Sequence, residues 1–230
     1  MAFVKGIDVS RWQGAIDWEA VREDGIQFAF IKAGGSDCGF YEDLFFDVYM
    51  KEAYAAGIKI GVYYYVGPRC TSFDDGEADG KRLVEICSKW KPYITLPLVI
   101  DFEAPPARDK AGNTAAVRGF CKAVTDAGYS AMVYASETSG FSERLNLAAI
   151  PDILKWCAKW SSVEPKSVDW TVWQQTSEGH VDGISTPVDI DFFDPAAWSL
   201  FNPVDDPGTG TLKAALANLK AAIEKVEAFL

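Results

Sequence analysis

The chain has 230 residues, 49% of them hydrophobic, and a formal net charge of −11 at pH 7. This length and apolar content suit one full domain with a small appendage. The negative charge and the absence of a Lys/Arg cluster disfavour binding to nucleic acid, because phosphates attract basic surfaces. No run of about 18 apolar residues is present, so we expect no membrane span. The N-terminus lacks the basic-then-apolar layout of a secretory signal, which favours synthesis in the cytoplasm without Sec export.

The cysteine and histidine content excludes several classes of enzyme. The five cysteines are scattered, odd in number and without CxxC spacing, so we expect reduced, packed thiols rather than a disulfide framework or a zinc knuckle. Ser-His-Asp, Cys-His and zinc peptidase chemistry would each have to use the single histidine, His180. His180 lies in a Gly-containing stretch typical of a solvated loop, which disfavours all three.

Short runs rich in Val, Ile, Phe and Tyr alternate with amphipathic stretches of about 12 to 18 residues, a pattern typical of parallel strands joined by helices. Eight strands are predicted, at Phe3–Val9, Gln27–Ala33, Ile58–Val66, Leu98–Phe102, Tyr129–Ala135, Leu154–Lys159, Thr171–Gln175 and Val188–Phe193. Helices are predicted at Trp18–Glu23, Asp43–Ala56, Asp74–Trp90 and Thr114–Ala127, with Gly25, Gly57 and Gly128 as helix stops. Eight strands favour an irregular, TIM-like α/β barrel. We expect the irregularity after Trp160, where helical segments shorten and the strands are joined by turns.

The C-terminal part of the chain differs from the rest. A segment rich in Pro, Gly and Asp predicts that the main domain covers residues 1–202 and that a linker covers residues 203–210. In residues 211–230, apolar residues recur at spacings of four and three, which predicts an amphipathic helix with a heptad pattern. Fewer than three heptads are marginal for an isolated coiled coil. Three alternatives stay open: a helix packed on the barrel or fraying alone, self-association, and a stump before a further module.

Two acids follow one apolar strand directly, in the segment that ends Ile100-Asp101-Phe102-Glu103. The two-residue period of a strand places Asp101 and Glu103 on the same face. Like charges at that spacing raise the pKa of one group, so that one carboxyl keeps its proton while the other is an anion. Glycosidic cleavage needs this division of labour. A lone Asp at a strand end would more simply indicate solvent exposure, but a pair on one face is harder to explain that way.

Two other predicted strands also carry acids near their ends. Asp8 closes the first strand, and Asp189 and Asp191 lie in the last one. The C-terminal ends of barrel strands meet at one mouth, where active sites are built, and the first and last strands become neighbours on closure. We therefore predict a site that contains Asp8, Asp101, Glu103 and Asp189, with Asp191 beside it.

Aromatic side chains predict the sugar-binding part of this site. Five of them fall at or just beyond predicted strand ends: Trp12, Tyr63, Tyr65, Tyr134 and Trp173. Flat apolar rings with polar tips can stack on pyranose faces, although each ring taken singly is more often part of a core. Lys32 ends another apolar strand, where its ammonium group either pairs with the acids or reaches outward to solvent.

These residues and their order resemble glycoside hydrolase family 25, the lysozyme family of phage endolysins, bacteria and some fungi. The matching segments are Gly6-Ile7-Asp8-Val9-Ser10 with Trp12-Gln13-Gly14 and Ile16-Asp17-Trp18, then Phe30-Ile31-Lys32-Ala33, Gly61-Val62-Tyr63, Leu98–Glu103, Val172–Ser177, Val181–Ile184 and Val188-Asp189. The resemblance covers about residues 3–194 in the right order. It is therefore more specific than any one motif.

The resemblance implies an irregular α/β barrel that cleaves the β-1,4 bond between N-acetylmuramic acid and N-acetylglucosamine in bacterial peptidoglycan, without metal or cofactor. It implies Glu103 as the proton donor and Asp101, Asp8 and Asp189 as supporting acids. Tyr63, Tyr134, Lys32 and Trp173 would be binding or supporting positions. The protein would then be made in the cytoplasm and act on the cell wall.

The sequence departs from the family pattern at three positions. Asp182 stands where the family often has Pro, Tyr64 where it often has His, and Asp191 where it often has Asn. Asp191 adds a negative charge beside the site and should raise a neighbour's pKa. No departure removes a catalytic acid, which argues against a non-catalytic glycan-binding protein. Two further alternatives stay open: a phage structural protein that works through its C-terminal helix, and a chitinase-like enzyme, which would share the Asp-x-Glu pair.

Overall fold

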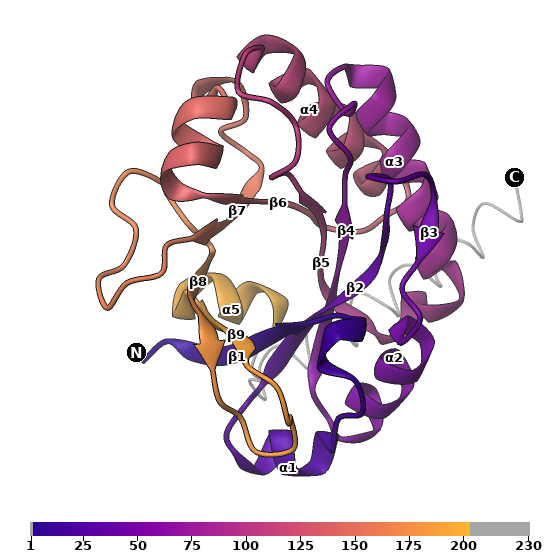
Figure 1. Cartoon of the computed structure of the whole chain (residues 1–230), viewed down its shortest axis with the longest axis vertical. Coiled ribbons are helices and arrows are strands. Elements are labelled where there is room, and N and C mark those ends of the chain that lie inside the picture. Colours follow the sequence, from indigo (N-terminus) through magenta and orange to yellow (C-terminus); the bar gives the residue numbers. More distant parts are fainter. Residues whose placement is uncertain (1, 203–230) are drawn as a thin grey trace, which may run out of the picture. The chain divides into compact units, whose positions relative to one another are not determined.

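The computed structural model describes residues 2–202, and its central feature is a closed β-barrel (Figure 1). The strands are β1 (Val4–Val9), β2 (Phe28–Gly35), β3 (Tyr41–Glu42), β4 (Lys59–Tyr65), β5 (Ile94–Asp101), β6 (Ala131–Ser136), β7 (Leu154–Ala158), β8 (Val172–Gly179) and β9 (Val188–Phe193). They pair in the order β1-β9-β8-β7-β6-β5-β4-β2-β3, and an additional β1–β2 pairing closes the ring. Among the strands of residues 2–202, β3 alone lies outside the ring, paired with the end of β2. The predicted α/β barrel is confirmed.

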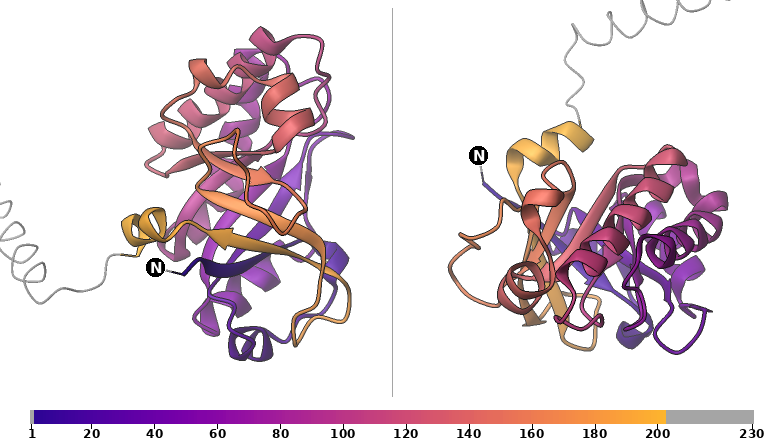
Figure 2. Two further views of the ribbon diagram at one scale, coloured as in Figure 1. Left: turned by 90° about the vertical axis from the view of Figure 1, so that its left-hand side faces the viewer. Right: turned by 90° about the horizontal axis from the view of Figure 1, so that it is seen from above.

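One strand reverses the direction of the barrel. The other ring strands run parallel to one another, whereas β9 runs antiparallel to both β8 and β1. Figure 2 shows the orange strands β8 and β9 beside the indigo β1. The irregularity predicted after Trp160 is confirmed, but the expectation that the last strand brings its C-terminal end to the mouth was wrong. Asp189 reaches the mouth because it lies at the start of its antiparallel strand.

The described helices are α1 (Trp18–Glu23), α2 (Phe46–Ala55), α3 (Phe73–Cys87), α4 (Lys110–Asp126) and α5 (Pro195–Phe201). Short helical turns occur at Arg11–Gln13, Ser88–Tyr93 and Leu147–Ala149, and a π-helix occurs at Glu137–Ser142. The side chains of Asp17, Ser72 and Asp109 cap α1, α3 and α4 by accepting backbone N–H groups. None of the helices in residues 2–202 is long and apolar enough to cross a membrane. The predicted linker (203–210) and heptad helix (211–230) lie outside the described residues.

Several element bounds differ from the prediction. The glycines Gly25, Gly57 and Gly128 follow α1, α2 and α4 with φ of +87°, +80° and +78°, as expected of helix stops. In contrast, β5 begins at Ile94 instead of Leu98, because the sheet accommodates Pro97 beside a register shift between Ile60 and Val62. The two-residue β3 and the π-helix carry no periodic signal and were not predicted.

Aromatic rings fill the inside of the barrel. Phe30 of β2 stacks on Trp156 of β7 with ring centroids 4.6 Å apart. Phe28, also on β2, meets Phe193 of β9 edge to face at 5.4 Å. Gly6 and Gly61 make room for these rings, because a Cβ at Gly6 would lie 2.4 Å from the Phe28 ring and one at Gly61 would lie 2.2 Å from the Phe30 ring. The interior below the mouth is therefore an apolar floor of close-packed rings.

Two of the outer helices, α3 and α4, touch through their backbones (Figure 1). A Cβ at Gly76 of α3 would lie 1.8 Å from the carbonyl oxygen of Ala116, and one at Gly119 of α4 would lie 2.0 Å from that of Phe73. The glycines thus set the distance between the helices.

The five cysteines are free thiols. Four of them are buried, and Cys38 is exposed.

We expect Gly76→Ala to destabilise the fold although Ala favours helix formation. Helix propensity alone would make the variant about 1 kcal/mol more stable, whereas a methyl group placed against the Ala116 carbonyl forces the helices apart at a cost of about 1–3 kcal/mol or more. Urea unfolding followed by circular dichroism measures the free energy of unfolding. Ala78→Gly, at an exposed position of α3, calibrates the propensity effect. A Gly76→Ala protein that is more stable than the wild type by as much as Ala78→Gly is less stable would contradict the close approach of the two helices.

Candidate active site

A cavity of about 360 Å³ opens at the mouth of the barrel. It brings together nine of the predicted site residues: Asp8, Trp12, Lys32, Tyr63, Tyr65, Asp101, Glu103, Tyr134 and Asp189. It is also lined by Ser10, Gln13, Trp156, Trp160, Gln174 and Ser177, which were not predicted. Trp156 and Gln174 lie on the inward face of β7 and β8, the face that lines the cavity. The alternation of side chains along a strand shows which residues share a face, but it does not show which face is inward. Ser10, Gln13 and Trp160 lie beyond strand ends, and Ser177 lies within the last three residues of β8.

Asp101 and Glu103 lie at the end of β5 and differ in their surroundings. Asp101 is buried, with 6% of its surface exposed, and its Oδ1 accepts no hydrogen bond from the described residues. Burial and then the Glu103 charge raise the pKa of Asp101 well above its ordinary value, although Lys32 opposes the shift. Glu103 stands at the exposed rim, and partial desolvation raises its pKa against the opposing charges of Lys32 and Arg144. The two carboxyl groups therefore hold a proton to higher pH than free carboxyls do.

Asp8 of β1 is held by Gln174 of β8. The Gln174 amide donates a hydrogen bond of 2.8 Å to Asp8 Oδ2, and its Oε1 accepts from the Tyr134 hydroxyl at 2.9 Å and from the Trp160 indole at 3.1 Å. Because an indole N–H can only donate, it fixes the Gln174 oxygen toward Trp160 and the amide nitrogen toward Asp8. One side chain thus connects an acid, a tyrosine and a tryptophan from distant parts of the sequence.

Asp191 lies beneath this cavity and does not line it. Its side chain is fully buried, and its Oδ1 accepts a hydrogen bond of 2.8 Å from the indole of Trp156. Burial, followed by the Asp189 charge, raises the pKa of Asp191 well above its ordinary value, and a hydrogen bond with Asp8 opposes the shift. The structure therefore makes Asp191 a buried partner of Asp8 instead of the predicted substrate contact, because its position on the antiparallel β9 is two residues below the mouth.

Asp189 and Lys32 complete the charged groups around the cavity. Asp189 is half-buried, and desolvation together with the Glu103 charge raises its pKa to about 6. A hydrogen bond from its own backbone N–H opposes this shift. The Lys32 ammonium group lies 4.7 Å from the ring centre of Tyr65 and 5.8 Å from that of Tyr63. These cation–π contacts and the carboxyl groups of Asp101 and Glu103 hold the Lys32 charge inside the cavity, so it does not reach outward to solvent.

Two exposed tryptophans line the cavity, Trp12 with 72% and Trp160 with 65% of its surface exposed. Trp12 sits in the helical turn after β1, where the Arg11 guanidinium lies 4.9 Å from its ring centre. Trp160 begins the loop between β7 and β8. Both rings are large apolar surfaces held at a polar site, which is the arrangement that binds sugar faces.

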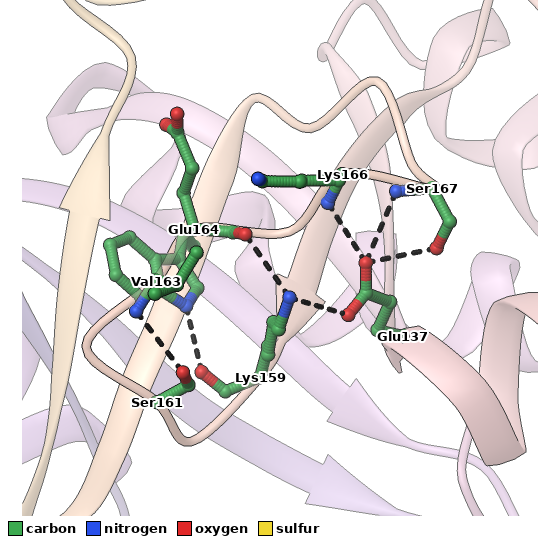
Figure 3. Close-up of polar contacts among 8 residues, drawn as sticks. Glu137, Lys159, Ser161, Val163, Glu164, Lys166 and Ser167 are labelled. Atoms are coloured by element: carbon green, nitrogen blue, oxygen red, sulfur yellow. Dashed lines mark hydrogen bonds and ion pairs between the residues drawn. The ribbon is translucent and has the colours of Figure 1, made fainter.

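The loop that carries Trp160 is anchored by Glu137 (Figure 3). Glu137 Oε1 accepts hydrogen bonds from the backbone and side chain of Ser167 and from the backbone of Lys166, and Oε2 pairs with Lys159 at 3.1 Å. Desolvation opposes ionisation of Glu137, but these donors outweigh it and lower its pKa to about 2. Lys159 also donates to the Glu164 carbonyl at 3.2 Å. The anchor stays charged over the working pH range of most enzymes and fixes both ends of the loop.

Trp173 is not brought into the cavity. It is neighbour to the inward-facing Gln174 on β8, so strand alternation turns its indole to the outer face. There it is buried between Trp170 and Phe192 and donates a hydrogen bond of 2.8 Å to the Lys159 carbonyl. Trp173 therefore supports the base of the Trp160 loop and does not contact a ligand in the cavity.

The donor set suits acid–base chemistry. In residues 2–202, no group of three or more His, Cys, Asp or Glu side chains is arranged to hold a metal ion. His180 is exposed and does not line the cavity. Carboxyl groups with raised pKa values, next to aromatic rings in a polar cavity, can transfer protons to and from a sugar.

The sequence matches Glycosyl hydrolases family 25 over residues 7–184. It is 32% identical to Lysozyme M1 of Streptomyces globisporus over 208 residues, which are 84% of this chain and 69% of that protein. It is 27% identical to the autolytic lysozyme of Clostridium acetobutylicum over 208 residues. This match covers 90% of this chain but only 61% of that protein, less than two thirds of its length. Among solved structures, the bacterial lysozyme from Streptomyces coelicolor aligns with a TM-score of 0.68 and 25% identity, over 87% of this chain and 96% of the other. The chain therefore belongs to glycosyl hydrolases family 25 and is a glycoside hydrolase of the lysozyme type.

Proposed function

We propose that this glycoside hydrolase is an N-acetylmuramidase, which cleaves the β-1,4 bond between N-acetylmuramic acid and N-acetylglucosamine in bacterial peptidoglycan. Glu103 is the general acid, and Asp101 stabilises the charge that develops at the anomeric carbon. The observation that carries the proposal is that Asp101, the last residue of β5, and Glu103, two residues beyond it, line one cavity, the first buried and the second at a rim lined by exposed indoles. The similarity to lysozymes supports the choice of polymer.

The bond is broken by proton transfer from Glu103. The proton passes to O4 of N-acetylglucosamine as the bond from C1 of N-acetylmuramic acid to O4 breaks, and the bonding electron pair leaves with the oxygen. Asp101 and its acidic neighbours stabilise the positive charge at C1. Water supplies the new hydroxyl group at C1, and its remaining proton restores the carboxyl pair. The assignment of Glu103 holds for inversion, for a covalent intermediate and for assistance by the N-acetyl group, because each needs an acid at the leaving oxygen.

The floor of the barrel raises the pKa of the proposed acid. Asp101 and Glu103 lie above packed aromatic rings, and desolvation raises the pKa of both carboxyls. Protonated acid is thus available at a pH where a free glutamic acid has lost its proton. Lys32 limits this shift, because its positive charge lowers the pKa of both groups.

We expect Glu103→Gln to lower the rate of peptidoglycan hydrolysis by about 10²–10⁴-fold, because the amide cannot donate a proton to the leaving oxygen. Turbidity clearance of purified walls gives the rate, and mass spectrometry of the products should show reducing terminal muramic acid with the wild type. Glu23→Gln, on the exposed surface of α1, is the matched control and should keep full activity. A Glu103→Gln protein that clears walls at the wild-type rate would show that another group is the acid.

The buried pair of Asp8 and Asp191 makes stability depend on pH. Asp191 Oδ2 has no hydrogen-bond donor among the described residues, and its neighbour Asp8 is also a carboxyl, so a proton between them relieves the repulsion. Burial raises the pKa of both groups. The folded chain then holds a proton that the unfolded chain releases above about pH 4. The free energy of unfolding therefore falls as the pH rises from there through the raised pKa.

We expect Asp191→Asn to be more heat-stable than the wild type at pH 8, by at least about 3 °C in Tm, with a smaller difference at pH 4.5. Asn keeps an oxygen for the Trp156 indole and gives Asp8 an N–H donor in place of a like charge. Scanning calorimetry at the two pH values measures the difference. An equal or negative difference at pH 8 would mean that the pair does not retain a proton in the folded state.

A further inference from the structure

A second cavity of about 420 Å³ adjoins the first at the mouth of the barrel. The two cavities share Tyr65, Glu103, Tyr134 and Trp160, so they meet at the proposed acid. The second cavity adds the end of β6, the π-helix and the residues that follow it. A ligand whose scissile bond lies at Glu103 has one of its substituents next to this space.

The distinctive group of the second cavity is the guanidinium of Arg144. Its Nε donates a hydrogen bond of 2.7 Å to the Pro105 carbonyl, and its Nη1 donates to the Ser139 carbonyl. These two bonds fix the plane of the guanidinium and leave three of its five N–H groups for other acceptors. No carboxylate of residues 2–202 lies within 4.0 Å of it, since the ion pairs of the described chain do not include Arg144. Ser136 and Ser139 stand beside it with their hydroxyl oxygens 2.6 Å apart, so one of the two hydroxyl protons is left to donate.

The charge of the chain and of its ligand indicates what the Arg144 guanidinium binds. The chain carries a net charge of −11, and the first cavity contains Asp8, Asp101, Glu103 and Asp189. Muramic acid carries a lactyl arm that ends in a carboxylate or in an acidic peptide, so the polymer is an anion that this surface repels. Lys32 is occupied by the tyrosine rings inside the first cavity. Arg144 is then the cation of the second cavity, with the planar fork that pairs best with a carboxylate.

We propose that Arg144 binds the carboxylate that the lactyl arm of the muramic acid residue carries, either its own or that of the attached peptide, with the Ser136/Ser139 hydroxyls as further donors. The second cavity is then where the enzyme distinguishes peptidoglycan from a neutral β-1,4 glycan. The inference rests on the proposed function, because it needs muramic acid beside Glu103. It adds a residue that selects the substrate and leaves the bond-breaking chemistry unchanged.

The test uses the full chain with three soluble glycan substrates of the same backbone. One carries peptide stems, one has had the stems removed and bears the free lactyl carboxylate, and one has that carboxylate converted to a neutral methylamide. We expect Arg144→Gln to raise KM and to lower kcat/KM for a carboxylate-bearing substrate about tenfold or more relative to the methylamide. Arg144→Lys, which keeps the charge without the fork, should lose less. Arg118→Gln removes the same charge from the exposed face of α4 and should leave the ratios of the three substrates as they are in the wild type.

Each outcome decides the proposal. A loss confined to the stem-bearing glycan assigns the peptide carboxylate, and a loss confined to the stem-free acid assigns the lactyl carboxylate. A loss on both, relative to the methylamide, shows that Arg144 binds whichever carboxylate the arm carries. A ratio that is unchanged on all three substrates overturns the proposal. Comparing ratios cancels the effect of Arg144 on the pKa of Glu103, because that effect is common to the three substrates.

Binding measurements separate this inference from the proposed function and from misfolding. Calorimetric titration of the Glu103→Gln protein with the three glycans needs no Arg144 variant, and equal affinity for all three would overturn the inference even if Arg144→Gln does not fold. If the wild type releases no reducing muramic acid, yet binds the acid form more tightly than the methylamide and loses this preference in Arg144→Gln, the proposed function fails and the Arg144 site stands. If hydrolysis is found without that preference, the inference fails alone.

Discussion

The structure depends on carboxyl groups that are desolvated above a floor of aromatic rings. Phe30 and Trp156 close the interior of the barrel, and the acids stand directly above them. Burial is the largest cause of the raised pKa of Asp8, Asp101, Glu103, Asp189 and Asp191. A wetter floor would bring the pKa values of these groups back toward their ordinary range, so the site would retain protons less well. The packing of the apolar rings therefore also sets the pKa values of the acids.

The site is held together by contacts between segments that are far apart in the chain. Gln174 of β8 joins Asp8 of β1, Tyr134 of β6 and Trp160 of the following loop. Glu137 anchors that loop to the end of β6 (Figure 3). Such contacts form only when the barrel closes, so the aromatic surfaces and the acids become aligned in the same step as the fold. A rigid barrel positions the site, and capped turns and anchored loops carry its rim.

The distribution of cations follows from the excess of acids. Lys32 lies among tyrosine rings beside Asp101 and Glu103 and offsets part of their repulsion. Arg144 is fixed by two backbone carbonyls and not by a carboxylate, so its charge stays directed at the second cavity. In a chain with a net charge of −11, Lys32 thus offsets negative charge within the first cavity, and Arg144 places a positive charge at the second.

Local patterns of the sequence determined the parts of this protein that depend on neighbouring residues. The strand period placed Asp101 and Glu103 on one face, glycines after periodic segments marked helix ends, and eight apolar runs indicated a closed α/β barrel. The direction of β9, the burial of Asp191 below the mouth, the outward position of Trp173 and the entry of Trp160 and Arg144 into the cavities were decided by tertiary structure alone. Alternation tells which residues share a face but not which face is inward, and loops have no period. Only closure of the barrel, by pairing β1 with both β2 and β9, settles these choices.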